Sequence, residues 1–218
     1  MTNWWALATV SASAGGATTQ PTFQPLSDEV WEHVVFDGRR HVPLSTLPGM
    51  AERTVKVGSA GKIFSLTGWK VGWVVAPPAL AETVAKAHQF VTFSTAPNLQ
   101  SAVAYGLGKP LADIERTCAD FAVARDRLGR GLEAEGFAVL PAQGTYFMSI
   151  DLAGSGIAAD DAAFCERAVT EAGVAAIPVS AFYAENPVQS VIRLCFAKKA
   201  ETLDAGIERL GKARALFV

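Results

Sequence analysis

The sequence predicts a chain of mixed helices and strands whose C-terminal part is a small α+β unit. Half of the 218 residues are hydrophobic, which is enough for a sizeable core in one large or two small domains. Short apolar or β-branched runs alternate with longer stretches of helical spacing. After residue 136 the strand-like runs become more frequent. Strands flanked by helices there favour the α+β unit.

In the first part of the chain, the elements are separated by glycine and proline. We expect a strand at 54–57, a short apolar run at 72–76, and helices at 80–90, 98–107 and 111–135. Gly136 is expected to end the last of these helices. The segment 24–26 makes a poor strand.

In the second part, four strand-like runs surround one helix, and another helix follows them. The strands are expected at 137–140, 146–152, 174–179 and 191–196, and the helices at 160–172 and 200–216. Gly173 is expected to cap the first of these helices.

Composition excludes several classes of function. The formal net charge is −2, so there is no basic field to attract nucleic acid. No apolar stretch is long enough to span a membrane. The three cysteines, an odd number among apolar or helical patterns, suggest reduced thiols in the cytoplasm.

The N-terminal segment differs from the rest. Residues 1–27 contain no charged side chain, and residues 1–26 are predicted to form an irregular leader. The apolar run at 4–10 followed by Ala12-Ser13-Ala14 imitates a secretory signal, but it lacks the positive region that such a signal needs.

The stretch 59–73, SAGKIFSLTGWKVGW, carries the strongest indication of chemistry. Ser59 and Lys62 form a Ser-x-x-Lys pair after the predicted strand, and Lys70 adds a second cation. Glycines in and beside the stretch let the backbone approach a ligand closely. A nearby positive charge and partial burial both disfavour a lysine's ammonium form, so the amine of Lys62 can act as a nucleophile.

Three kinds of site compete for this stretch. The first is a lysine that forms a Schiff base with pyridoxal phosphate. The second is a serine acyl-enzyme with Ser59 as nucleophile. Such enzymes also have Ser-Asp-Asn and Lys-Thr-Gly motifs, and neither occurs in this chain. The third is a P-loop, which fails because Lys56 and Ile63 stand at positions of a required glycine and hydroxyl residue. A glycine-rich loop without chemistry is the remaining alternative.

The surrounding segments resemble the fold-type I aminotransferases of class I/II. The resemblance is carried by 28–33 (DEVWEH), 36–41 (FDGRRH), 144–147 (GTYF), 177–180 (IPVS) and 192–196 (IRLCF) together with the lysine stretch. The branch it resembles contains the kynurenine/glutamine aminotransferases and cysteine-conjugate β-lyases. The similarity covers roughly residues 27–218 and corresponds to the C-terminal half of such a protein.

The resemblance implies an α/β fold. Residues 27–110 would be the later part of the pyridoxal-phosphate-binding large domain, with a mostly parallel sheet, and residues 111–218 the small C-terminal α+β domain. Residues 1–26 match nothing in that family. The half that precedes these segments in the family supplies a ring-stacking aromatic residue, an asparagine, further phosphate donors and much of a dimer interface.

The resemblance also implies roles for individual residues. Lys62 would form the internal aldimine with pyridoxal 5′-phosphate, and Asp28 would face the pyridine nitrogen. Trp31 stands where the family usually has tyrosine, and its indole N–H could keep the contact to the ring oxygen. The alternatives are a helix-capping role for Asp28 and a packing role for Trp31.

The remaining implied contacts are to anions. Ser59 and Lys70 would bind the cofactor phosphate, and many relatives have arginine in place of Lys70. Arg193, in an apolar strand, would bind the substrate α-carboxylate through paired hydrogen bonds. No metal ligand is predicted.

The implied function is transfer of an amino group from an amino acid to a 2-oxo acid, in a cytoplasmic protein that is a homodimer when full length. Two alternatives stay open: a non-catalytic remnant of an aminotransferase, and a pyridoxal-phosphate-dependent cysteine-conjugate β-lyase. No nucleic-acid or membrane partner is expected.

Overall fold

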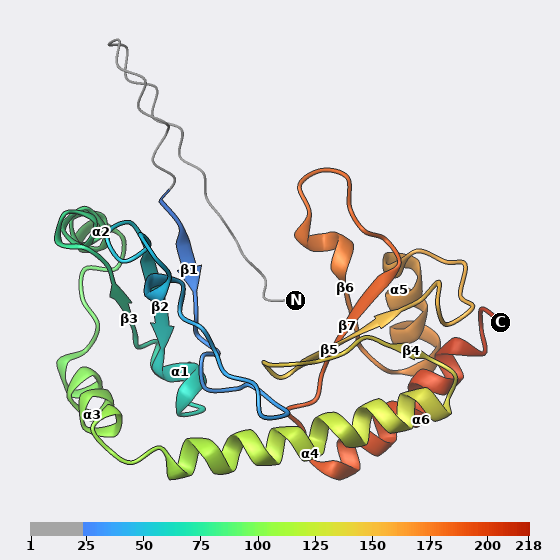
Figure 1. Ribbon diagram of the computed structural model, residues 1–218. Coiled ribbons are helices and arrows are strands. Elements are labelled where there is room, and N and C mark those ends of the chain that lie inside the picture. Colours follow the sequence, from blue (N-terminus) through green and yellow to red (C-terminus); the bar gives the residue numbers. More distant parts are fainter. Residues whose placement is uncertain (1–23) are drawn as a thin grey trace. The chain divides into compact units, whose positions relative to one another are not determined.

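The computed structural model describes residues 24–218 (Figure 1). The chain divides into two compact units, the first ending at Glu115 and the second beginning at Arg116. Most of the predicted leader and the signal-like run at 4–14 lie outside the described residues. Within the described part, no helix is both long enough and apolar enough to cross a membrane.

The first unit is built on a three-stranded sheet with short and long helices after it. Its elements are β1 (Leu26–Asp28), η1 (Leu44–Thr46), β2 (Val55–Ser59), α1 (Ala60–Ile63), η2 (Thr67–Trp69), β3 (Gly72–Val75), α2 (Pro78–Val91) and α3 (Pro97–Leu107). The strand order is β1-β2-β3. The predicted strand, apolar run and two helices of this part are therefore confirmed, with ends shifted by a few residues.

The expectation of a poor strand at 24–26 is wrong at its last residue, because β1 begins at Leu26. The backbone N–H of Val55 donates to the carbonyl of Pro25 at 2.9 Å, and β1 then pairs in parallel with β2. Ser27 is buried and points its hydroxyl at Glu29. Pairing with a neighbouring strand, which no local pattern reveals, makes this polar segment a strand.

The α/β class is confirmed, but the described sheet is not mostly parallel. β1 and β2 are parallel, whereas β2 and β3 are antiparallel, with Ser59 opposite Gly72. Parallel neighbours need a crossover connection, usually a helix of several turns. The residues between β2 and β3 form only α1 and η2, and they reverse the direction of the chain.

The core of the first unit lies beneath the lysine stretch. Ala60 and Val71 are buried together with Val103, the one buried residue of α3. Phe64, Trp73 and Leu99 pack against this cluster. The core therefore fixes both ends of the segment that carries Lys62.

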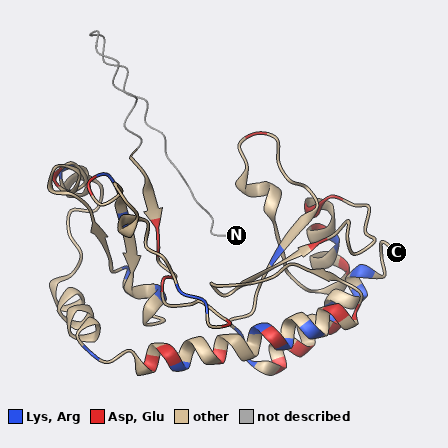
Figure 2. Cartoon of the chain, viewed as in Figure 1, with Lys and Arg blue, Asp and Glu red and all other residues tan. Residues whose placement is uncertain are grey.

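The second unit consists of strands flanked by helices, as the α+β prediction expects, and its sheet is antiparallel. Its elements are β4 (Ala138–Val139), β5 (Phe147–Asp151), α5 (Asp161–Ala172), β6 (Ile177–Pro178), η3 (Val179–Phe182), β7 (Val191–Cys195) and α6 (Ala200–Arg214), and α4 (Ala112–Ala134) leads into it. The strand order is β4-β5-β7-β6. All three pairings are antiparallel. Figure 2 shows charged residues along α4 and α6, whereas α3 carries none.

The capping predictions are confirmed. Gly136 follows α4 with φ of +84°, and Gly173 follows α5 with φ of +66°, conformations that glycine adopts without strain. The Asp160 carboxylate accepts the N–H of Ala163 at 2.7 Å and caps α5 at its N-terminus.

The predicted strand at 174–179 is mostly wrong, since β6 contains only Ile177 and Pro178. The N–H of Val174 donates to the carbonyl of Ala168 in α5, so it is not available for strand pairing. Pro178 has no N–H, and the 3-10 helix η3 begins at Val179. η3 lies close to β7, and one of its residues contacts Arg193, which is described below.

Candidate active site

The site in the first unit forms where β1 and β2 end. Asp28 is the last residue of β1, and Ser59 is the last residue of β2. The two strands are parallel, with Asp28 opposite Val57, so both residues lie at the same edge of the sheet (Figure 1). Ligands of open α/β sheets bind outside this edge, at the carboxyl ends of the strands.

Lys62 reaches this edge from the single helical turn α1. The neighbouring residues Ala60, Gly61 and Ile63 are buried, while Lys62 itself is half-buried. The Lys62 Nζ lies 5.3 Å from the centre of the Trp31 ring. The structure thus brings together two of the predicted cofactor-binding residues, one from the turn after β1 and one from the helix after β2.

Asp28 is exposed, and its carboxylate is only lightly engaged. Its Oδ1 accepts the N–H of Val30 at 3.2 Å, which forms a turn rather than a helix cap. Within the described residues it makes no ion pair, so the carboxylate is open to a cationic ligand group.

Ser59 and Lys70 lie close together along the backbone. Ser59 pairs with Gly72, and the N–H of Ala60 donates to the carbonyl of Val71 at 3.1 Å, next to Lys70. Lys70 is exposed and has a left-handed backbone with φ of 56°. The Ser59 hydroxyl makes no capping hydrogen bond to α1. In the described part of the chain, neither side chain is committed to a protein partner.

Glycines keep this segment tightly packed. A Cβ on Gly58 would lie 2.2 Å from the Nε1 of Trp73, so the indole occupies the place of a side chain. A Cβ on Gly72 would lie 2.7 Å from the carbonyl oxygen of Gly58. The Thr67 hydroxyl donates to the carbonyl of Gly61 at 3.2 Å, which holds η2 against α1. These contacts fix the backbone on either side of Lys62.

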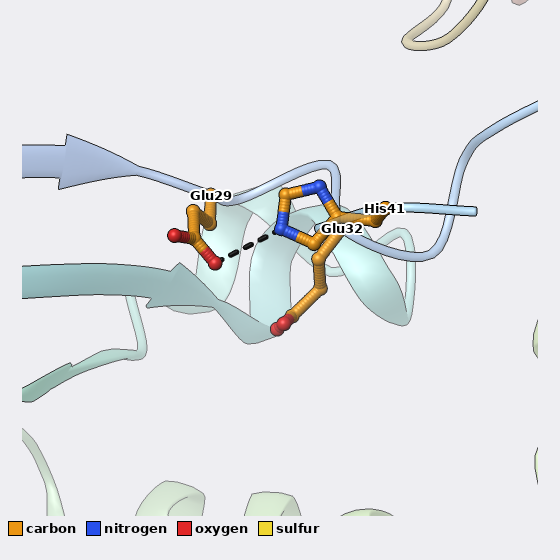
Figure 3. Close-up of side chains that lie close together, drawn as sticks. All are labelled: Glu29, Glu32 and His41. Atoms are coloured by element: carbon orange, nitrogen blue, oxygen red, sulfur yellow. Dashed lines mark hydrogen bonds and ion pairs between the residues drawn. The ribbon is translucent and has the colours of Figure 1, made fainter. Parts of the chain in front are cut away.

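A buried ionic network supports the turn after β1, and sequence reasoning missed it. Glu29 is 5% exposed, and Figure 3 shows its carboxylate facing the ring of His41 with Glu32 beside it. The His41 Nε2 lies 2.9 Å from Glu29 Oε2, and the N–H of Leu44 donates to Oε1 at 2.9 Å. The network ties the turn that carries Trp31 to the loop that follows it.

Lys56 completes the network from β2. Its Nζ lies 3.3 Å from Glu29 Oε2 and forms an ion pair with Glu32. Ligand atoms of Glu29, Glu32 and His41 lie within 4.8 Å of one another, but both carboxylates are already paired with the Lys56 ammonium. One signal could have revealed the network: a lysine between Val55 and Val57 in a strand needs an acidic partner when it is buried.

The network shifts the titration of both charged partners. Burial raises the pKa of Glu29, but hydrogen bonds from His41, Leu44 and Ser27, together with the Lys56 charge, outweigh burial and lower the pKa below 4.5. Burial lowers the pKa of Lys56, but the hydrogen bond and charge of Glu32 and the charge of Glu29 raise it above 10.5. Both groups are therefore ionised at neutral pH.

Arg193 lies in the second unit, on β7 between β5 and β6. It is half-buried and stands opposite Ser149 on one side and Ile177 on the other. Its guanidinium carbon lies 4.2 Å from the centre of the Phe147 ring and 4.5 Å from that of Phe182. Its Nε is buried without a hydrogen-bond partner, and it forms no ion pair within the described residues. A cation held between two rings with unused donors can bind an anion.

Comparison with known proteins identifies the class. The family model described as aminotransferase class I and II matches residues 18–210. This match begins earlier than residue 27, the start of the similarity expected from the sequence motifs. The chain therefore belongs to the class I and II aminotransferase family.

Individual relatives agree with this assignment. The chain is 42% identical to the methionine aminotransferase of Escherichia coli over 85% of this chain and 48% of that protein. It is 36% identical to the kynurenine–oxoglutarate transaminase of Dictyostelium discoideum over 89% of this chain and 49% of that one. Among solved structures, the N-succinyldiaminopimelate aminotransferase of Mycobacterium tuberculosis matches with a TM-score of 0.83 and 40% identity, over 88% of this chain and 50% of that one. The chain thus spans about half the length of the relatives it matches.

Proposed function

We propose that this chain is the cofactor- and carboxylate-binding part of a pyridoxal-phosphate-dependent aminotransferase, which transfers an amino group from an amino acid to a 2-oxo acid. The observation that carries the proposal is the position of Lys62. Its amine lies over Trp31, at the sheet edge where Asp28 and Ser59 end their strands. Membership of the family supports the reaction class.

The residues at this edge fit pyridoxal 5′-phosphate. The uncommitted carboxylate of Asp28 would hold the pyridine nitrogen in its protonated form. The hydroxyl of Ser59 and the ammonium of Lys70 would bind the phosphate, and the indole N–H of Trp31 would donate to the ring oxygen. When bound, the cofactor supplies an electron sink for charge that develops at the substrate Cα.

Lys62 would have two tasks. Its amine would hold the cofactor through the aldehyde carbon and, once displaced by the substrate amine, would move a proton at the substrate Cα. Half-burial and the Trp31 ring restrict the side chain to the edge of the sheet. The close packing of Gly58 and Gly61 in the same segment supports a fixed position for this amine.

Arg193 would bind the substrate α-carboxylate. Two aromatic rings orient its guanidinium, and a carboxylate can accept two parallel N–H bonds from it. The names of the relatives point to different amino acids, so the proposal is limited to α-amino acids and the matching 2-oxo acids as a class.

A second candidate is a non-catalytic aminotransferase remnant, in which the site binds the cofactor but does not transfer an amino group. Large exposed side chains in the first unit, such as Phe90 (84%) and Phe93 (83%), support association with a second copy. We propose a cytoplasmic homodimer for the complete protein.

Single-turnover amino transfer separates the two candidates. The chain is mixed with pyridoxal phosphate and then with L-methionine, L-glutamine or L-kynurenine, and the pyridoxamine phosphate formed is measured by chromatography. The Lys62→Ala variant is the test, and Lys86→Ala, at an exposed lysine of α2, is its matched control. Conversion by wild type and Lys86→Ala but not by Lys62→Ala supports the enzyme. Cofactor binding without conversion above the Lys62→Ala level supports the remnant.

A further inference from the structure

We propose that Asp161 is a positioning residue for Arg193, because it fixes both ends of the loop that places Phe182 on the guanidinium. The inference rests on the proposed function of Arg193 as the carboxylate-binding residue. All of the residues concerned lie in the second unit.

Asp161 is a fully buried carboxylate whose two oxygens are directed at one residue. It is 0% exposed. Its Oδ2 accepts the N–H of Ser180 at 2.7 Å, and its Oδ1 accepts the Ser180 hydroxyl at 2.7 Å. A buried charge of this kind is tolerated only when it is well hydrogen-bonded. Asp160 already caps α5, so capping does not explain Asp161.

The backbone of Asp161 holds the other end of the same loop. Its N–H donates to the carbonyl of Gln189 at 2.7 Å. Between these two anchors, residues 181–189 are exposed and contain no strand. One buried residue therefore joins the start and the end of an otherwise solvent-exposed loop.

The loop delivers Phe182 to Arg193. Phe182 is the last residue of η3, two residues after Ser180, and its ring centre lies 4.5 Å from the Arg193 guanidinium carbon. Phe147, on β5, is held by strand pairing with Cys195. Phe182 belongs to no strand, and β6 ends at Pro178. Among the described contacts, the Asp161–Ser180 pair supplies the side-chain anchor that Phe182 itself lacks.

Fixing the guanidinium in advance favours anion binding. The Arg193 Nε is buried without a partner, so the position of the rings decides where its N–H groups point. Ordering this side chain before a ligand arrives removes part of the entropy cost of binding. Loss of the Asp161 anchor should therefore weaken carboxylate binding and leave the Lys62 site in the first unit unchanged.

The test follows the Nε–H signal of Arg193 by nitrogen-15 NMR, assigned with Arg193→Lys. The probe is 3-phenylpropionate, a carboxylate without an amino group. In Asp161→Ala we expect faster Nε–H exchange and an affinity for the probe lower by about fivefold or more, the change that loss of a hydrogen bond can cause. Asp161→Asn is the rescue variant, because its amide can accept the Ser180 N–H and donate to the Ser180 hydroxyl.

A second variant covers the case in which Asp161→Ala fails to fold. Ser180→Ala removes the hydrogen bond from the Ser180 hydroxyl to the Asp161 carboxylate and keeps the one from the Ser180 backbone N–H. A smaller change in the same direction is therefore expected. Phe182→Leu removes the ring directly and should reproduce the exchange effect. Unchanged Arg193 exchange and probe affinity in folded Asp161→Ala or Ser180→Ala would overturn the positioning role. If the Nε–H signal of Arg193 in the wild-type chain does not change when 3-phenylpropionate is added, the carboxylate-binding role itself would be overturned.

Discussion

The ammonium of Lys62 lies 5.3 Å from the centre of the Trp31 ring, although the two residues are separated by a loop and a strand. The parallel pairing of β1 and β2 produces this contact, because it places the turn after one strand beside the helix after the other. An aromatic face stabilises a nearby ammonium. The same indole carries an N–H donor.

Trp31 should contribute to cofactor affinity through that N–H. Trp31→Phe keeps a ring over Lys62 but loses the donor, so we expect the dissociation constant for pyridoxal phosphate to rise about fivefold. Trp31→Tyr restores a donor and should bind within about twofold of wild type. Absorbance titration with the cofactor measures both. Trp69→Phe is the control, at a tryptophan of the same unit that is 38% exposed. Equal affinity of Trp31→Phe and wild type would exclude the hydrogen bond.

Glu29 should make the first unit sensitive to acid. Its pKa is lowered in the folded state, so the unfolded state binds more protons and stability rises with pH. The contribution is fully present above pH 4.5, the ordinary value, and is lost as pH falls through the lower folded pKa. Glu29→Gln should cost roughly 1–3 kcal/mol at neutral pH and flatten this acid dependence.

Urea unfolding followed by tryptophan fluorescence between about pH 3 and pH 7 measures this effect. All five tryptophans lie between residues 4 and 73, so the described ones report on the first unit. Glu52→Gln, at an exposed glutamate, is the matched control. An acid slope in Glu29→Gln as steep as in wild type would contradict the role of the network.

Gly58 should tolerate no side chain. In Gly58→Ala the new Cβ would meet the Trp73 indole at 2.2 Å, so the indole or the strand must move. We expect a loss of about 1–3 kcal/mol of unfolding free energy, the usual cost of overpacking. At Gly68 a Cβ would meet nothing within 4 Å, and Gly68→Ala should be close to neutral. Similar urea midpoints for the two variants would show that Trp73 does not pack on Gly58 in solution.

None of the three cysteines, all of which the structure describes, forms a disulfide bond, and their thiols should differ in reactivity. Burial, with the nearby Asp161 charge, raises the pKa of Cys165 to about 11, whereas Cys118 and Cys195 are half-buried. Only the thiolate reacts, so at pH 8 Cys165 should be labelled last. Timed alkylation with peptide mass spectrometry gives the order. Labelling of Cys165 as fast as Cys118 would show that α5 opens far more readily than its packing indicates.

Local sequence patterns predicted the elements that have a clear helical period and a capping residue. The helix at 111–135 with Gly136, and the helix at 160–172 with Gly173, follow from periodicity and capping and are confirmed as α4 and α5. β1 could not be predicted in this way, because its strand character comes from pairing with β2. The early end of β6 could have been suspected from Pro178, but the η3 helix after it depends on Asp161, a distant partner.

The candidate site was predicted residue by residue, but its support was not. Lys62 and Trp31 were named from the resemblance, and the structure brings them into contact. Glu29 and Asp161 act through partners that neither spacing nor composition reveals, and only Lys56, between two valines of a strand, gives a local sign of an acidic partner. Their common feature is a charged side chain that is itself buried or half-buried.

The measurement that tests the central claim most directly is chemical capture of the cofactor on the chain. The protein is incubated with pyridoxal phosphate, reduced with borohydride, digested and mapped by mass spectrometry, with Lys62→Ala and Lys86→Ala treated in parallel. We predict one label per chain at Lys62, absent from Lys62→Ala and retained in Lys86→Ala. Labelling spread over several lysines, or equal labelling of Lys62→Ala and wild type, would contradict the assignment of this edge of the sheet as the cofactor site.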